Sequence, residues 1–324
     1  MSYIKHLKPM ALCCVIIVLL SGCAFVKMPL VPSAQPLREK VVDGKGRNKI
    51  LVVDISGIIS DRKRISGWGL RERVSVVAEV EEALKKAEAD DAISGVILRI
   101  NSPGGTVTAS DIIYHEVLRY KKKTGVRVVA CLMDVGTSGA YYVATAADEI
   151  LAHPTSLTGS IGVMAMKFNV QGLFSRIGIE EETIKSAAMK DLWSPFRPNT
   201  PEEKEILQSV IDTLHRRFVD VVADGRKTLT RQDVERLADG RIFTADQACA
   251  VGLIDGVGYL NEAVERLKEK AGIEKASVIM YYRPGSYKGS VYSGIAPQVI
   301  NLIAVNGEGL AAPAGVHFMY LWAP

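Results

Sequence analysis

The chain has 324 residues and 48% apolar content, enough for a large buried core and one sizeable domain with additions. Its formal net charge of +4 is too small to predict nucleic-acid binding, and no alternation of basic and aromatic residues runs along it. Outside the first 23 residues the cysteines are Cys131 and Cys249, and no spacing typical of a metal site occurs. We therefore expect no cofactor, no metal and no nucleic-acid partner.

The N-terminus has the features of an export signal. Two lysines precede an apolar run from Met10 to Leu20, and Ser21-Gly22-Cys23 follows directly. The run is shorter than the roughly 20 apolar residues that a spanning helix needs, so residues 1–22 are predicted to be a signal peptide. Their ending resembles a bacterial lipobox, which makes Cys23 the expected lipidation site; an uncleaved anchor is the alternative. A lipid at Cys23 predicts a membrane-associated protein that faces the periplasm or the cell exterior.

A folded domain is expected to follow a tether. Residues 23–47 contain several prolines and polar side chains, which is typical of a linker. The domain is expected over residues 48–275, beginning with a strand at 49–55 and an amphipathic helix at 74–88. Strand and helix patterns then alternate to about residue 185, which predicts an α/β architecture.

Two strand-to-helix turns contain residues that suit acyl-transfer chemistry. The first is Asn101-Ser102-Pro103-Gly104-Gly105, between a strand at 94–100 and a helix at 107–122. Paired glycines there allow positive φ and let a substrate carbonyl approach the backbone closely. Glycine and proline are also the usual residues of an ordinary loop, so this turn does not define a site by itself.

The second turn is Thr137-Ser138-Gly139. It lies between a short apolar strand at 126–133 and an alanine-rich helix at 141–147. A serine at the start of a helix presents its hydroxyl where free amides and the helix dipole stabilise an oxyanion. The alternative is a helix N-cap, a role that serine commonly fills. Ser138 is therefore the candidate nucleophile.

These two turns, the run from Leu157 to Val163 and the run from Gly240 to Asp255 resemble the signal peptide peptidase A family. The four motifs occur in order over roughly residues 48–270. The resemblance implies an α/β fold of the Clp protease/crotonase-like type, with repeated ββα and βα units and an added C-terminal helical region. It also implies a serine endopeptidase that uses a Ser-Lys dyad to cleave apolar peptides such as released signal peptides.

The resemblance also indicates the catalytic base. Clp proteases use a histidine, but the corresponding run from Pro154 to Ile161 contains none. In the signal peptide peptidases the base is a lysine a few residues before a proline, which selects Lys190 rather than Lys185. A lysine acts as a base only when neutral, so desolvation has to lower its pKa from the usual value of about 10.4.

Further residues complete the site that the resemblance implies. Ser160 occupies the position of the serine that orients the lysine in this family, and the amides of Gly105 and Gly139 are the expected oxyanion donors. Single-domain members of the family form ring-like oligomers in which serine and lysine come from neighbouring subunits. We therefore expect a homo-oligomer in which Ser138 and Lys190 lie beyond hydrogen-bond reach within one chain.

The C-terminal part of the chain is predicted to be helical at first and to end in an aromatic tail. A helix is expected from Thr200 to about Asp224, and its apolar stripe from Ile206 to Phe218 predicts core or subunit contacts. Residues 276–324 are the expected tail, with a strand at 278–282. Because exposed aromatic ends are unusual, we expect the tail to dock on its own assembly, on a neighbouring subunit or on the membrane.

Two other functions share parts of these patterns. A crotonase-like acyl-CoA enzyme has the same fold and oxyanion loop but uses carboxylates and does not need Ser138. A catalytically inactive, membrane-tethered scaffold keeps the fold and tolerates the loss of both Ser138 and Lys190. Labelling with a serine-acylating reagent, with Ser138→Ala as the control, separates the peptidase from both.

Overall fold

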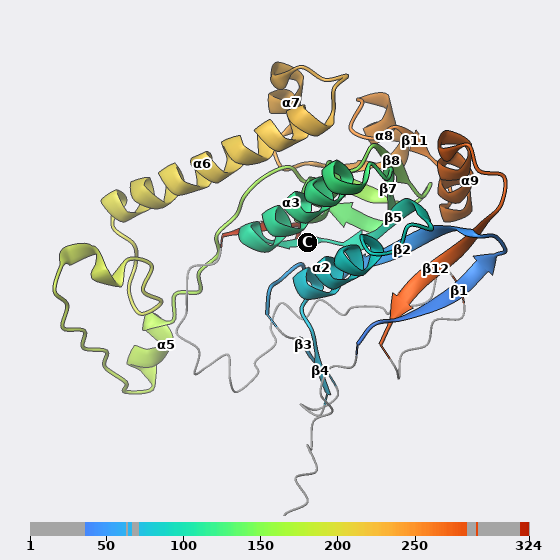
Figure 1. Ribbon diagram of the computed structural model, residues 1–324. Coiled ribbons are helices and arrows are strands. Elements are labelled where there is room, and N and C mark those ends of the chain that lie inside the picture. Colours follow the sequence, from blue (N-terminus) through green and yellow to red (C-terminus); the bar gives the residue numbers. More distant parts are fainter. Residues whose placement is uncertain (1–35, 63, 67–70, 284–289, 291–317, 324) are drawn as a thin grey trace, which may run out of the picture. The chain divides into compact units, whose positions relative to one another are not determined.

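The computed structural model describes residues 36–62, 64–66, 71–283, 290 and 318–323 (Figure 1). The chain divides into a small unit of residues 1–34 with 65–73 and a large unit of residues 35–64 with 74–324. Two short strands, β3 (Arg64–Ser66) and β4 (Arg71–Arg73), form a two-stranded sheet, and all of their residues except Arg64 belong to the small unit. The expected signal peptide at 1–22 and the lipidation site Cys23 lie outside the described residues.

A nine-stranded, mostly parallel sheet forms the centre of the large unit (Figure 1). Its order is β1-β12-β2-β5-β7-β8-β11, with β9 paired to the end of β7 and β10 paired to β9. The β1–β12 and β9–β10 pairs are antiparallel, and the others are parallel. The strands are β1 (Arg38–Gly44), β2 (Asn48–Ser56), β5 (Ile93–Ser102), β7 (Val128–Thr137), β8 (Glu149–Ala152), β9 (Leu157–Gly159), β10 (Ile242–Thr244), β11 (Gly256–Val257) and β12 (Ala276–Tyr282).

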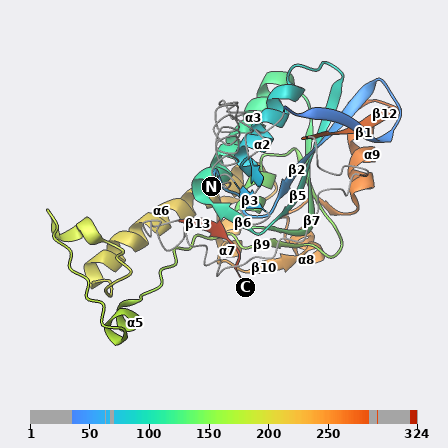
Figure 2. The same cartoon turned by 90° about the horizontal axis from the view of Figure 1, so that it is seen from below.

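Helices cover both faces of this sheet, with α2 and α3 on one side and α9 on the other (Figure 2). The helices are α2 (Val76–Ala87), α3 (Val107–Thr124), α4 (Gly139–Ala144), α5 (Gln171–Arg176), the 3-10 helix η1 (Ala188–Asp191), α6 (Pro201–Gly225), α7 (Arg231–Leu237), α8 (Ala245–Ala250) and α9 (Leu260–Ala271). A second, two-stranded sheet joins β6 (Gly104–Thr106) to β13 (Met319–Leu321). Among the described residues, none of the helices has the length and apolar character of a membrane span.

Strand residues alternate between two apolar cores. In β2, Leu51 and Val53 belong to the larger core that the sheet shares with α2, α3 and α4, whereas Ile50 and Val52 belong to the smaller core beneath α9. A strand covered on both faces buries side chains of both orientations, which explains the apolar run from Ile50 to Val53. The predicted alternation of strands and helices, and with it the α/β fold class, is confirmed.

The structure differs from the expected linker at residues 23–47. Residues 38–44 form β1, which pairs antiparallel with β12. Without this pairing, the outer edge of β12 would leave a row of backbone amides and carbonyls unpaired. The second half of the expected linker is therefore the edge strand of the main sheet.

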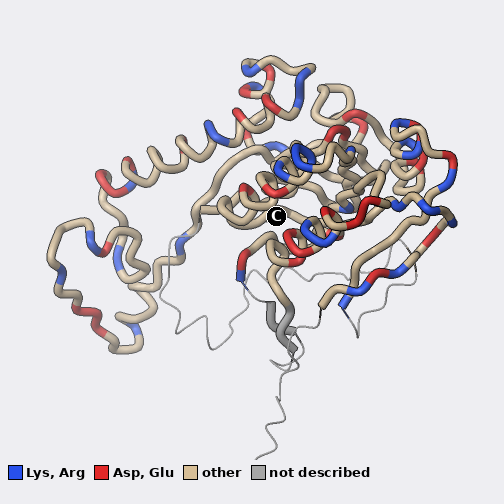
Figure 3. Tube along the Cα trace, in the orientation of Figure 1, with Lys and Arg blue, Asp and Glu red and all other residues tan. Residues whose placement is uncertain are grey.

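Lys and Arg residues are mixed with Asp and Glu along the helices rather than gathered by sign (Figure 3). Some of these charges hold the fold together. Arg226, at the end of α6, contacts both carboxylate oxygens of Asp255 at 2.7 and 2.8 Å, and Asp255 also accepts from the amide of Ile150 in β8 at 2.7 Å. Asp255, the last residue of the fourth sequence motif, therefore has a structural role, because it joins the end of α6 to β8.

Candidate active site

Ser138 lies at the turn from β7 into α4. Its φ of 53° and ψ of −120° are values that residues other than glycine rarely adopt. A capping serine accepts a hydrogen bond from an amide in the first turn of its helix, but the Ser138 side chain makes no such bond. The hydroxyl has no hydrogen-bond partner in the described part of the chain, although the residue is only 1% exposed. Ser138 therefore stands at the N-cap position of α4, but its side chain does not cap the helix.

The two expected oxyanion amides lie close together beside this turn. A β-carbon at Gly139 would come within 3.2 Å of the Gly105 amide nitrogen and within 2.3 Å of Ser110 Oγ. A β-carbon at Gly104, whose φ is 103°, would lie 2.8 Å from the Gly139 amide nitrogen. These short separations require glycine and place the amides of Gly105 and Gly139 in one small region next to Ser138.

Ser160 lies next to Ser138 because their strands are paired. In the parallel β7–β9 ladder Thr137 is opposite Gly159, and the Ser138 amide donates to the Gly159 carbonyl at 2.7 Å. Ser160 also has a positive φ, of 50°, and it is buried. The structure thus brings the candidate nucleophile and the candidate orienting serine to the same corner of the sheet.

Lys190 is not brought to this corner within one chain. It lies on η1, in the mostly exposed segment of residues 164–200, which includes α5, precedes α6 and extends away from the sheet (Figure 2). Its ammonium makes no hydrogen bond or ion pair with any described residue, and nothing in the described chain links it to Ser138 or Ser160. A single chain therefore holds the serine half of the expected dyad without its lysine.

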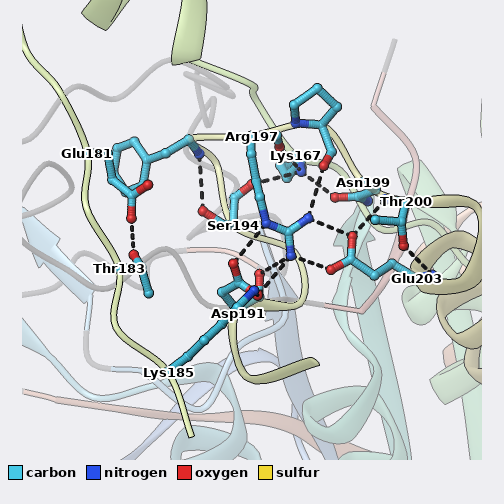
Figure 4. Close-up of polar contacts among 12 residues, drawn as sticks. Lys167, Glu181, Thr183, Lys185, Asp191, Ser194, Arg197, Asn199, Thr200 and Glu203 are labelled. Atoms are coloured by element: carbon cyan, nitrogen blue, oxygen red, sulfur yellow. Dashed lines mark hydrogen bonds and ion pairs between the residues drawn. The ribbon is translucent and has the colours of Figure 1, made fainter. Parts of the chain in front are cut away.

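An ion-pair cluster anchors the turn that carries Lys190 (Figure 4). Asp191 accepts from Lys185 at 2.6 Å and from Arg197 at 2.8 Å, and Arg197 also pairs with Glu203 at the start of α6. The Arg197 guanidinium, with Lys185 beside it, holds the pKa of Asp191 well below its usual range. The same guanidinium lowers the pKa of Glu203 to about 2. Lys185 is therefore engaged in a structural ion pair, whereas the Lys190 ammonium remains available.

Lys167 is a further lysine near this segment. Burial lowers its pKa, which is what a catalytic lysine requires. However, Lys167 Nζ donates to the carbonyls of Ser194 and Arg197 at 2.8 and 3.1 Å and contacts Asn199 Oδ1 (Figure 4). Because its donors are committed to these oxygens, Lys167 links the two ends of the segment and is a poor candidate for the base.

The histidines that the structure describes are not placed for catalysis with Ser138. His215 Nε2 lies 2.8 Å from a backbone carbonyl after α7, and His153 stacks edge-on against Tyr259. His115 is exposed on α3. No cluster of histidine, cysteine, aspartate or glutamate among the described residues is arranged to hold a metal ion.

The aromatic tail docks within its own chain, at the candidate site. Strand β13 pairs antiparallel with β6, so that Tyr320 is opposite Gly105. The Tyr320 side chain is fully buried. Sequence reasoning expected the tail to dock but did not locate the place, because three residues of strand carry no pattern that identifies their partner.

The chain is similar to known protein families. The family model of Peptidase family S49 matches residues 120–274, and that of Clp protease matches residues 58–158. An Enterococcus faecium protein named as a signal peptide peptidase SppA is 35% identical over 243 residues, which is 75% of this chain and 70% of that protein. The chain belongs to peptidase family S49. The resemblance to the signal peptide peptidase A family is thereby confirmed, and with it the serine peptidase class.

Other S49 relatives are longer than this chain. The chloroplastic serine protease SPPA of Arabidopsis thaliana is 33% identical over 262 residues, 79% of this chain but 38% of its own length. Protease 4 of Salmonella typhi is 33% identical over 192 residues, 59% of this chain and 31% of its own length. The chain therefore spans about a third of these two relatives.

The two family matches divide the site between them. Their overlap, residues 120–158, contains β7, Ser138 and α4. Ser160 and Lys190 lie beyond the Clp protease match, in the part that the S49 match alone covers. The turn that contains Ser138 is therefore the part of the candidate site that both family models cover.

Proposed function

We propose that this S49 chain is a Ser-Lys endopeptidase that hydrolyses extended apolar peptides, such as released signal peptides. The observation that carries the proposal is the backbone of Ser138, which has a rare positive φ and frees its hydroxyl from any capping bond. Backbone strain of this kind persists only where the surrounding structure imposes it, and it concentrates at active sites. Beside the amides of Gly105 and Gly139, such a serine is suited to attack a carbonyl.

In the proposed reaction, Ser138 Oγ attacks the scissile carbonyl and its proton passes to the neutral amine of Lys190. The amides of Gly105 and Gly139 stabilise the oxyanion; losing one such donor typically slows acyl transfer by about 10²–10³-fold. The lysine ammonium then gives the proton to the leaving amine, and water hydrolyses the acyl-enzyme with the lysine again acting as base. Ser160 would hold the lysine in place through its hydroxyl.

We propose further that Lys190 reaches this site from a neighbouring subunit of a ring-like homo-oligomer. The segment that carries it is rich in exposed apolar side chains: Met166, Phe168, Leu173, Ile177, Ile179 and Ile184. On α6, part of the predicted apolar stripe is also exposed. Phe218 is fully buried, whereas Ile206 and Val210 remain 38% and 36% exposed. Soluble monomers rarely expose so much apolar surface, and contact with a second copy of the chain would cover it.

We also propose that a lipid on Cys23 tethers the enzyme to a bacterial membrane, facing the periplasm or the cell exterior. The support is the sequence at residues 10–23, with its short apolar run and lipobox-like ending. Apolar peptides released in the same membrane would then be close to the site. The proposed partners are thus peptide substrates, the membrane and further copies of this chain.

The test of the catalytic proposal is labelling with a reagent that acylates active-site serines. We expect stoichiometric labelling of the full chain and none of Ser138→Ala, with Lys185→Ala as the control that keeps the proposed catalytic residues. Hydrolysis of apolar peptides should disappear in the same Ser138→Ala variant. Labelling or hydrolysis that survives in Ser138→Ala would show that another residue is the nucleophile, and a full chain that is neither labelled nor active on peptides would favour the acyl-CoA enzyme or the scaffold.

A further inference from the structure

Strand β7 contains a bulge shortly before Ser138. The β5–β7 ladder breaks off after Leu132 and resumes at Gly136, so that Asn101 of β5 alone faces residues 133–135 of β7. On its other edge, β7 pairs with β8 as far as Leu132 and then with β9. The bulge is therefore the point at which β7 changes both its register and its neighbour.

The side chain of Asn101 supplies a bond that the ladder lacks at the bulge. Its Oδ1 accepts from the Val135 amide at 3.1 Å, while its backbone carbonyl accepts from the Gly57 amide at 2.9 Å. The bulge separates the Val135 amide from the backbone of β5, and the side-chain oxygen takes the place of the missing acceptor. Asn101 opens the turn that contains Gly105, so this bond joins the expected oxyanion loop to the strand that ends at Ser138.

Two hydroxyls hold the bulge from the other edge of β7. Thr158 Oγ1 donates to the Gly136 carbonyl at 2.7 Å. The Ser156 hydroxyl contacts the Leu132 carbonyl at 2.9 Å and also the Met133 carbonyl. Both side chains are fully buried, so a carbonyl that lost its donor here would stay unpaired at a cost in free energy.

The bulge lies immediately before the candidate nucleophile. Only Thr137 separates Gly136 from Ser138, whose amide donates to the Gly159 carbonyl at 2.7 Å. Bulges redirect side chains, and they are concentrated beside active sites. The contacts that fix the bulge therefore also fix the direction in which the Ser138 hydroxyl points.

We propose that Asn101, Ser156 and Thr158 are positioning residues: by holding the β7 bulge, they set the Ser138 hydroxyl against the expected oxyanion amides. They act through the backbone of β7 and not on the substrate. The proposal rests on the proposed peptidase function for the reaction that Ser138 carries out. The effect of the three side chains on the backbone is measured without that reaction.

The kinetic test compares Thr158→Val with Thr158→Ser in the full chain. Valine has nearly the shape of threonine but lacks the hydroxyl, whereas serine keeps it. Thr158→Val should lower kcat for an apolar peptide, and the rate of labelling by a serine-acylating reagent, by about 10–100-fold, because a small displacement of the nucleophile costs that much. KM should change by less than about threefold, since substrate contacts remain. Thr158→Ser should stay within about threefold of the natural rate, since the donor is kept.

The matched control is Thr145→Val, at the far end of α4. Thr145 is also buried, and its hydroxyl donates to the Tyr142 carbonyl at 2.6 Å. The change removes the same kind of bond without touching the bulge, so kcat should stay within about threefold of the natural value. Thermal denaturation followed by circular dichroism establishes that each variant is folded.

Hydrogen exchange with residue resolution tests the backbone directly and needs no substrate. In Asn101→Leu, which keeps the size of the side chain but removes its acceptor, exchange of the Val135 amide should accelerate by about tenfold or more. Asn101→Asp keeps an oxygen acceptor and should preserve the natural exchange rate. Residues 129–131, earlier in β7, should be unchanged in both. If Asn101→Leu does not fold, the measurement is made on Thr158→Val, where residues 135–138 should exchange faster.

Two results would overturn the proposal. One is a kcat of Thr158→Val that equals the natural value or is matched by an equal loss in Thr158→Ser or Thr145→Val. The other is unchanged exchange at residues 135–138 in the variants that lack the side-chain bonds. A natural chain that is neither labelled nor active on peptides would instead contradict the proposed peptidase, and faster exchange in Asn101→Leu would still establish that these side chains hold the bulge.

Discussion

Ser138 and Ser160 end neighbouring parallel strands, and both have a positive φ, of 53° and 50°. The hydrogen bond from the Ser138 amide to the Gly159 carbonyl fixes their separation. The two residues therefore lie at the same corner of the sheet. This relationship supports the proposal that one lysine serves both serines.

The strained backbone at Ser138 predicts that glycine at this position stabilises the fold while it removes the proposed nucleophile. Ser138→Gly should abolish peptide hydrolysis and raise the free energy of unfolding by about 0.5–1 kcal/mol relative to Ser138→Ala, because glycine adopts positive φ without steric cost. Thermal denaturation of the two variants, followed by circular dichroism, measures the difference. Equal stability of the glycine and alanine variants would show that the backbone at this position is not strained.

The two lysines near η1 should behave differently. Lys190→Ala should reduce kcat by about 10³-fold or more, as the loss of one member of a catalytic unit does. Lys185→Ala should retain most activity, since it removes an ion pair to Asp191 that the Arg197 contacts can replace.

The rate of the natural enzyme should rise with pH, because a lysine base works in its neutral form. An inactive Lys185→Ala, or a pH-independent rate from mildly acidic to alkaline solution, would refute this choice of base.

The Arg197 cluster should make the Lys190 segment sensitive to acid. Pairing with Arg197 lowers the pKa of Glu203 from 4.5 to about 2, and that of Asp191 is also lowered. A carboxylate with a depressed pKa stabilises the folded state above its ordinary pKa, and this contribution is lost as the pH falls toward the folded value. The segment should therefore loosen between about pH 4.5 and about pH 2.

Trp193, two residues after Asp191, reports on this change when the other two tryptophans are replaced by phenylalanine. Its emission should shift to longer wavelength in that pH window. The same shift should already be present at neutral pH in Arg197→Ala, where the cluster is broken. An emission maximum that stays constant down to pH 2 would show that the cluster does not hold the segment.

The anchor proposal gives a prediction about processing. Cys23→Ser should abolish incorporation of a fatty-acid analogue and change the mature N-terminus, while the catalytic domain stays folded and active on soluble peptides. Metabolic labelling followed by mass spectrometry of the N-terminal peptide decides the point. Equal incorporation into the natural chain and the variant would contradict a lipid at Cys23.

The long elements and the glycine-serine turns could be predicted from the sequence because each depends on local signals. The strand at 126–133 and the turn at Ser138 follow from an apolar run that ends in small residues, as β7 and α4 show. β1 was not predicted, because a polar edge strand carries little pattern. β13 was not located either, since its position depends on pairing with Gly105, which is distant in sequence.

Lys190 shows a different limit of sequence reasoning. Its choice came from a family resemblance, and its surroundings within one chain are solvent and the ion pairs of its neighbours. In the proposed ring, the contacts that lower the pKa of this lysine come from a neighbouring subunit. The exposed apolar side chains of the same segment, such as Ile177 and Ile184, support that proposal.

The central claim, that Ser138 and Lys190 of different subunits form one site, is tested most directly by mixing two inactive variants. Ser138→Ala and Lys190→Ala are co-expressed, or unfolded and reassembled together at equal amounts, and peptide hydrolysis is measured against each variant alone. In a randomly mixed ring, about a quarter of the sites pair an intact serine with an intact lysine from the next subunit, so about a quarter of natural activity should return. Activity that stays at the background of the separate variants, in mixed oligomers shown to form, would contradict the account.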